Sequence, residues 1–148
     1  MSGSNRILII DDDFDHVFDL CDFVRDRGGE PVTARNAAEA RRRLAAIADG
    51  QESYALAIID VMMPIGSLED IAKLEHPTGE DSSQIGVTLC REARERYCIS
   101  PQMLDIVCFS IRNDIVEELM ALEVQYISKV SHGGWIKLYA YVEKAIAG

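Results

Sequence analysis

Two apolar runs in this chain end in carboxylates, and this feature constrains the fold most. The segment Tyr54–Asp60 reads YALAIID, so a buried-strand pattern leads directly into Asp60. The run Ile7–Ile10 leads into three consecutive acids, Asp11–Asp13. Continuous apolar runs are typical of strands buried on both faces of a parallel sheet. If these two strands lie side by side, their acids meet at the carboxyl edge, where open α/β sheets bind ligands.

A cluster of carboxylates repels itself unless it is protonated or neutralised by a cation. Hard oxygen ligands of this kind suit Mg²⁺, which keeps several waters and favours phosphate as a further ligand. The sequence therefore predicts a Mg²⁺-dependent site that handles phosphate groups.

Strand and helix patterns alternate along the chain. Strand patterns occupy Arg6–Ile10, Glu30–Ala34, Tyr54–Ile59, Leu104–Phe109 and Val124–Ile127. Helical spacing of apolar residues occurs over Phe14–Arg27, residues 36–48, Gly86–Tyr97, Asp114–Leu122 and Trp135–Ala147. Asp13 and Asn36 are expected to cap the first two helices. The alternation predicts an α/β fold of the (βα)₅ type, a doubly wound five-stranded parallel sheet with helices on both faces.

A single domain over residues 1–148 is expected, with an insert at about residues 65–85 between the third strand and its helix. This segment is too long for an ordinary strand–helix loop. Within it, Leu68, Ile71 and Leu74 recur at helical spacing, and one apolar stripe must pack on something. The insert is either a surface elaboration or an element that controls access to the site.

Charge and hydropathy exclude several classes of function. The net charge of −10 argues against nucleic-acid binding, which needs clustered Lys and Arg, and against docking on anionic membranes. No apolar run approaches the roughly 20 residues of a membrane span, and the start MSGSNR lacks the apolar segment of a signal peptide. A cytoplasmic location is expected.

Four of the five predicted strands end in residues that suit one site. The first ends in Asp11 and Asp12, the third in Asp60, the fourth in Ser110, and Lys129 follows the fifth. Acids, a hydroxyl and an amine should therefore converge at one edge of the sheet, a stronger signal than any of them alone.

The segments ILIIDDD, IIDVMMP, VCFS and YISK, in this order, resemble the receiver domain of two-component response regulators. The resemblance covers nearly the whole chain apart from the insert. It implies a flavodoxin-like fold with strand order 2-1-3-4-5, and a phosphorylation-dependent signalling switch rather than an enzyme, with at most weak autophosphatase activity. It also implies a sensor histidine kinase or phosphotransfer protein as partner.

The resemblance assigns roles at the acidic edge. Asp60 matches the carboxylate that accepts a phosphoryl group. Asp12 matches a direct Mg²⁺ ligand, and Asp11 matches its neighbour in the acidic pocket. Met62 stands where a backbone carbonyl completes the metal shell.

The remaining matches concern the switch. Ser110 matches the hydroxyl that moves to the phosphoryl oxygens, Lys129 the amine that pairs with them, and Tyr126 the aromatic residue that turns inward. Two positions depart from the family pattern: Val130 stands where proline is usual, and Ile111 where a small residue is common.

Two alternatives stay open. A phosphatase of the haloacid-dehalogenase type would use Asp11 as nucleophile and Asp13 as the second acid, but it expects Thr or Val at the position of Asp15. A degenerate receiver would keep the fold and signal without phosphate. The three histidines show no ligand spacing and are expected at the surface or at helix starts; they are His16, His76 and His132.

Overall fold

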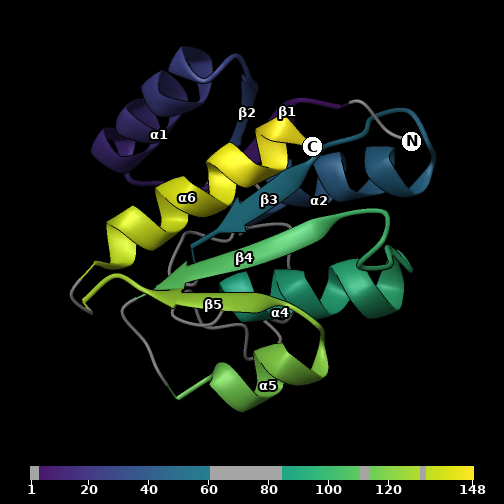
Figure 1. The fold of residues 1–148 in the computed structure, drawn as a ribbon. Coiled ribbons are helices and arrows are strands. Elements are labelled where there is room, and N and C mark those ends of the chain that lie inside the picture. The colour runs from purple at the N-terminus through teal and green to yellow at the C-terminus, as the bar shows by residue number, and fades with distance from the viewer. Residues whose placement is uncertain (1–3, 61–84, 111–113, 131–132) are drawn as a thin grey trace.

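The computed structural model describes residues 4–60, 85–110, 114–130 and 133–148, which form five strands and the helices around them (Figure 1). The strands are β1 (Arg6–Ile10), β2 (Glu30–Ala34), β3 (Leu56–Ile59), β4 (Asp105–Ser110) and β5 (Gln125–Ser128). The α-helices are α1 (Phe14–Asp26), α2 (Ala37–Ala48), α4 (Ile85–Arg91), α5 (Val116–Ala121) and α6 (Gly134–Ala147), and a π-helix, η2 (Glu92–Arg96), continues α4.

The five strands form one parallel sheet in the order β2-β1-β3-β4-β5. This confirms the predicted fold class and strand order. Ile10 pairs with Ile59 at the carboxyl ends of β1 and β3, so the residues that follow these two strands leave the sheet side by side. Hydrogen bonds extend the pairing, since the Asp60 N–H donates to the Ile10 carbonyl at 2.9 Å.

The sheet is covered on both faces, as the continuous apolar runs predict. Side chains alternate along a strand, so neighbours in β1 enter different cores. Ile7 and Ile9 pack with α1 and α6, whereas Leu8 and Ile10 pack with α2, α4 and α5. All four are fully buried. Figure 1 shows α6 crossing one face of the sheet while α2 and α4 lie behind it.

The predicted helix caps are present. The Asp13 side chain accepts hydrogen bonds from the N–H groups of Asp15 and His16 at the start of α1. The Asn36 side chain accepts from the Glu39 N–H at the start of α2. Such caps satisfy N–H groups that have no partner within the helix. They fix the direction in which α1 leaves the acids that follow β1.

The predicted α-helix Gly86–Tyr97 is wrong in its second half. The α-helix ends at Arg91 and a π-helix follows, in which the Tyr97 N–H reaches the Glu92 carbonyl, five residues back, at 2.9 Å. Arg94 explains this irregularity, because its guanidinium donates to four backbone carbonyls outside the helix, those of Ile99, Leu104, Leu122 and Glu123. Such tertiary contacts override the regular helical pattern.

The other predicted elements differ from the observed ones only at their ends. β3 begins at Leu56 rather than at Tyr54. The Tyr54 side chain lies before the strand, and its hydroxyl donates a hydrogen bond to Glu52. The insert at residues 65–85 lies outside the described residues except for Ile85, which is fully buried in α4. Within the described part of the chain, no helix is long and apolar enough to cross a membrane.

Candidate functional site

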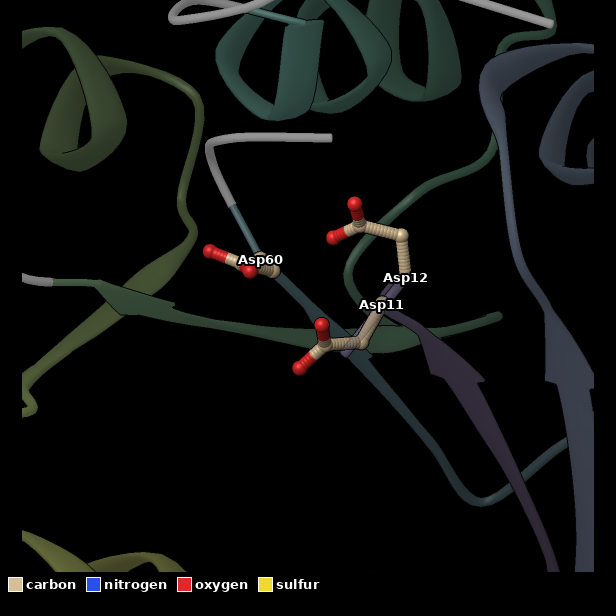
Figure 2. A group of neighbouring side chains, drawn as sticks. All are labelled: Asp11, Asp12 and Asp60. Carbon is tan, nitrogen blue, oxygen red and sulfur yellow. The ribbon is translucent and has the colours of Figure 1, made fainter. Parts of the chain in front are cut away.

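Three aspartates meet at the carboxyl edge of the sheet. Asp11 and Asp12 directly follow β1, and Asp60 directly follows β3. Figure 2 shows the three carboxyl groups around a common space. One oxygen from each lies within 4.8 Å of the others. The structure therefore brings together the acids that the sequence placed at two separate strand ends.

The three carboxyl groups differ in their exposure to solvent. Asp11 and Asp60 are buried, with 5% and 8% of their surfaces exposed, whereas Asp12 is exposed. One Asp11 oxygen, Oδ1, accepts a hydrogen bond from the Asp13 N–H at 2.9 Å. The Asp11 N–H donates to the Ala34 carbonyl at 3.1 Å. Asp11 is thus held on both sides by the backbone, while Asp12 can move toward a ligand from solvent.

The pocket favours protonation of its acids when nothing neutralises them. Burial raises the pKa of Asp11 from 3.8 to about 7, although the hydrogen bond from the Asp13 N–H opposes this shift. The nearby Asp60 carboxylate raises this pKa further, and the Lys129 ammonium lowers it. Partial burial also raises the pKa of Asp12, with a further contribution from Asp60. Negative charge at this edge is therefore under-compensated.

The donor set fits a Mg²⁺ ion. Mg²⁺ takes oxygen ligands at about 2.1 Å, so two ligand oxygens on one ion can lie up to about 4 Å apart. The spacing of the aspartate oxygens, within 4.8 Å, needs only small side-chain rotations to reach that range. Asp11, Asp12 and Asp60 would hold the ion. A cation there would offset the repulsion that raises the pKa of Asp11.

A lysine lies beside the buried carboxylate of Asp60. Lys129 Nζ lies 3.4 Å from Asp60 Oδ2, and both side chains are largely buried. The Lys129 N–H donates to the Ser110 carbonyl at 2.9 Å, so the ends of β4 and β5 stay together. Lys129 Nζ also lies 5.5 Å from the centroid of the Phe109 ring, within the range of a cation–π contact. The ammonium group is therefore positioned beside Asp60 rather than in solvent.

Ser110 and Tyr126 complete the edge. Ser110 ends β4 and is 1% exposed, and it pairs with Ser128 of β5. The Tyr126 hydroxyl donates to the Ser110 carbonyl at 3.5 Å, and its ring is half-buried. The hydroxyl, amine and acids predicted to converge thus lie at one edge. Their chemical roles stay predictions, and Met62 and Ile111 lie outside the described residues.

One contact near the pocket was not predicted from the sequence. His16 lies at the start of α1, as expected, and its Nδ1 atom is buried and lies 3.7 Å from Asp11 Oδ2. Its ring also touches Trp135, with 5.2 Å between the ring centroids. The i,i+3 spacing from Asp13, which places two residues on one helix face, was the available signal. The contact with Trp135 had no sequence signal, because it joins two helices that are far apart in the sequence.

Comparison with known proteins agrees with the fold. No family model and no curated protein matches the chain. Solved structures do match over nearly the full length. A two-component response regulator from Clostridium difficile is 20% identical, with a TM-score of 0.66 and 97% of each chain covered.

The chain has the receiver fold. The response regulator TrrA from Thermotoga maritima, solved in complex with Mg²⁺-BeF, has a TM-score of 0.62 at 20% identity, covering 95% of this chain and 98% of that one. The signal receiver domain of a histidine kinase from Syntrophus aciditrophicus has a TM-score of 0.62 at 22% identity, covering 98% and 92%. The resemblance to receiver domains is thus confirmed at the level of the fold.

Proposed function

We propose that this protein is a phosphorylation-dependent signalling switch in which Asp60 accepts a phosphoryl group with the help of Mg²⁺. The observation that carries the proposal is the geometry around Asp60. Two further carboxylates lie within metal-sharing distance of it, and a buried ammonium stands 3.4 Å away. A cluster of acids on an ordinary protein surface is not expected to combine these two features.

The chemistry is transfer to a carboxylate. An Asp60 oxygen attacks the phosphorus of a phosphohistidine on the donor, the P–N bond breaks as the new P–O bond forms, and the imidazole takes up a proton. Mg²⁺ supplies positive charge to the phosphoryl oxygens when bound. Lys129 adds its ammonium beside Asp60, which reduces repulsion between the carboxylate and the incoming phosphoryl group.

The donor is a sensor histidine kinase or a phosphotransfer protein, and the transfer takes place in the cytoplasm. Two structural neighbours contain beryllium fluoride: TrrA was solved in complex with Mg²⁺-BeF, and the DrrB receiver domain in a BeF₃-activated form. The shared fold supports a similar use of this pocket. Slow loss of the phosphoryl group by hydrolysis of the acyl phosphate is the only catalytic activity proposed.

The switch is a rearrangement of groups that already surround Asp60. The acyl phosphate adds negative charge and acceptor oxygens where Lys129 and Ser110 lie. These side chains follow the phosphoryl group, and Tyr126, which contacts the Ser110 carbonyl, responds to the shift. Lys129→Ala should therefore still be labelled to some extent but should show a smaller change in its amide NMR spectrum than wild type. A full wild-type change in the labelled variant would contradict this role of Lys129.

The phosphatase alternative is disfavoured by its own residues. Asp13 would have to face the reaction, but it caps α1 with Oδ1 and its side chain is 47% exposed. Asp11 would have to be the nucleophile, but its side chain is buried and its Oδ1 already accepts a hydrogen bond from the Asp13 N–H.

The decisive experiment is intact mass spectrometry after incubation with acetyl phosphate and Mg²⁺. We expect one added phosphoryl group in wild type, and none in Asp60→Asn or in wild type with EDTA. Asp105→Asn, a change at the opposite edge of the sheet, serves as the matched control and should be labelled normally. Wild-type protein that stays unlabelled both with acetyl phosphate and with phosphorylated donor proteins would favour the degenerate receiver instead.

A further inference from the structure

His16 carries a buried nitrogen that has no hydrogen-bond partner. Among the described residues, its Nδ1 is the one buried side-chain nitrogen or oxygen atom without a hydrogen-bond partner. Buried polar atoms are nearly always paired, so each exception calls for an explanation. The atom lies in α1, one helical turn beyond the acids that follow β1.

Two carboxylate oxygens face this nitrogen. Asp11 Oδ2 and Asp13 Oδ2 each lie 3.7 Å from His16 Nδ1. The other oxygen of each carboxylate is already used, because Asp11 Oδ1 accepts from the Asp13 N–H and Asp13 Oδ1 caps α1. The distance of 3.7 Å is slightly too long for a hydrogen bond. A small movement of Asp11 toward the ring would complete one.

The His16 ring is held on its other side by an aromatic group. Trp135, at the start of α6, meets it edge to face, with ring planes at 74°. Trp135 also meets Phe109 of β4 edge to face, with 4.8 Å between the centroids. Lys129 Nζ in turn lies 5.5 Å from the Phe109 ring and 3.4 Å from Asp60. These contacts form a closed circuit that leaves the pocket at Asp11 and returns to it at Asp60.

We propose that His16 is a positioning residue for Asp11 and that, through Trp135, it couples occupancy of the acidic pocket to the start of α6. The proposal rests on the proposed function, because it takes the pocket as the Mg²⁺ site. Its Nδ1–H steadies the Asp11 carboxylate in the orientation that serves the cation. Its ring transmits any reorientation of that carboxylate to Trp135.

This route is separate from the one through Tyr126. Tyr126 lies on β5 and packs with the core that faces α4 and α5, whereas Trp135 packs with the core that faces α1 and α6. The sheet lies between the two. Binding at one edge of the sheet is therefore expected to move side chains on both faces. Tyr126 responds on one face, and the His16–Trp135 pair responds on the other.

Two substitutions separate the two parts of the proposal. His16→Phe keeps an aromatic ring against Trp135 but removes the nitrogen. His16→Asn keeps an N–H donor on the atom next to Cγ, where His has Nδ1, but removes the ring. Arg27→Leu is the matched control, since Arg27, at the opposite end of α1 from His16, forms an ion pair with Glu143 of α6 at 3.0 Å.

Two readouts follow these variants. Calorimetry gives the Mg²⁺ affinity, and fluorescence reports Trp135 alone, because it is the only tryptophan of the chain. We expect His16→Phe to bind Mg²⁺ about tenfold more weakly than wild type, because removing a residue that orients a metal ligand commonly lowers metal affinity by at least this factor. We expect His16→Asn to bind close to wild type but to lose most of the Mg²⁺-induced fluorescence change. Arg27→Leu should match wild type in both.

The outcomes distinguish this inference from the function on which it rests. If wild-type protein binds no Mg²⁺, or if Asp12→Ala binds it equally well, the proposed metal site is wrong. If wild type binds Mg²⁺ through Asp12 but His16→Phe has the same affinity, His16 does not position Asp11. If His16→Asn keeps the full fluorescence change, the coupling to α6 does not pass through the imidazole ring. Either of these last two results overturns the inference.

Discussion

At the amino edge of the sheet, charged residues that begin the strands have partners, whereas at the carboxyl edge three clustered aspartates have one lysine beside Asp60. Arg6 and Glu30 begin β1 and β2 and form an ion pair at 3.0 Å. Asp105 begins β4 and accepts a hydrogen bond from the Tyr141 hydroxyl at 2.8 Å. At the other end of the same strands, burial and the Asp60 carboxylate raise the pKa of Asp11. One end of the sheet is arranged for stability, and the other holds repulsion that a ligand can relieve.

The comparison predicts different responses to the loss of an acid at the two edges, and the largest effect is the loss of phosphoryl labelling and metal binding at the carboxyl edge. Asp12→Ala should weaken Mg²⁺ binding by more than about tenfold, because a ligand matters at least as much as its supporting residues. It should also abolish labelling by acetyl phosphate while its unfolding free energy stays the same or rises, since one member of a like-charge cluster is gone. Calorimetry and denaturant unfolding measure these quantities.

The control for this prediction is Glu30→Ala at the amino edge, which should leave Mg²⁺ affinity unchanged. If both variants bound Mg²⁺ like wild type, the cation site would lie away from the acidic edge.

The next effect is a pH dependence of stability that arises from Asp11. The folded state raises the pKa of Asp11 from 3.8 to about 7, so the folded protein binds this proton more tightly than the unfolded chain. The resulting stabilisation is complete below about pH 4 and is lost as the pH rises through about 7. Asp11→Asn cannot lose a proton there, so its stability relative to wild type should rise between pH 4 and pH 8, by up to about 4 kcal/mol.

Chemical denaturation at a series of pH values, without Mg²⁺, tests this prediction. Saturating Mg²⁺ should reduce the pH dependence of wild type, since a cation offsets the charge on Asp11. A constant difference in unfolding free energy between the two proteins across this range would show that folding does not raise the pKa of Asp11.

The smallest effect concerns the amino edge. Tyr141→Phe removes the hydrogen bond to Asp105, and we expect a loss of about 1 kcal/mol in unfolding free energy. Because this contact lies at the opposite end of the strands, Mg²⁺ affinity should not change. Measurable weakening of Mg²⁺ binding in this variant would mean that the two edges are coupled, contrary to the comparison.

The parts of the fold and site that were predictable from sequence depended on local pattern plus one general rule. The apolar runs ending in Asp11 and Asp60 identified β1 and β3, and parallel strands necessarily bring their carboxyl ends to one edge. Ser110 and Lys129 followed from the same reasoning at β4 and β5. The capping roles of Asp13 and Asn36 were also local, since a cap involves residues only two or three positions apart.

The parts that were missed depend on contacts between distant segments. The π-helix after Arg91 contains Arg94, whose side chain donates to backbone carbonyls near β4 and β5. The spacing of apolar residues in the helix does not indicate these contacts. The His16–Trp135 contact joins α1 to α6 across more than one hundred residues of sequence. Neither feature has a periodicity or a spacing from which it could be inferred.

The most direct test of the central claim is to locate the phosphoryl group on the chain. Acyl phosphates of aspartate are reduced by borohydride, which leaves a modified residue that tandem mass spectrometry of peptides can identify. After labelling with acetyl phosphate and Mg²⁺, we predict reduction at Asp60 alone. Reduction at Asp11 or Asp12 instead would contradict the assignment of Asp60 as phosphoacceptor.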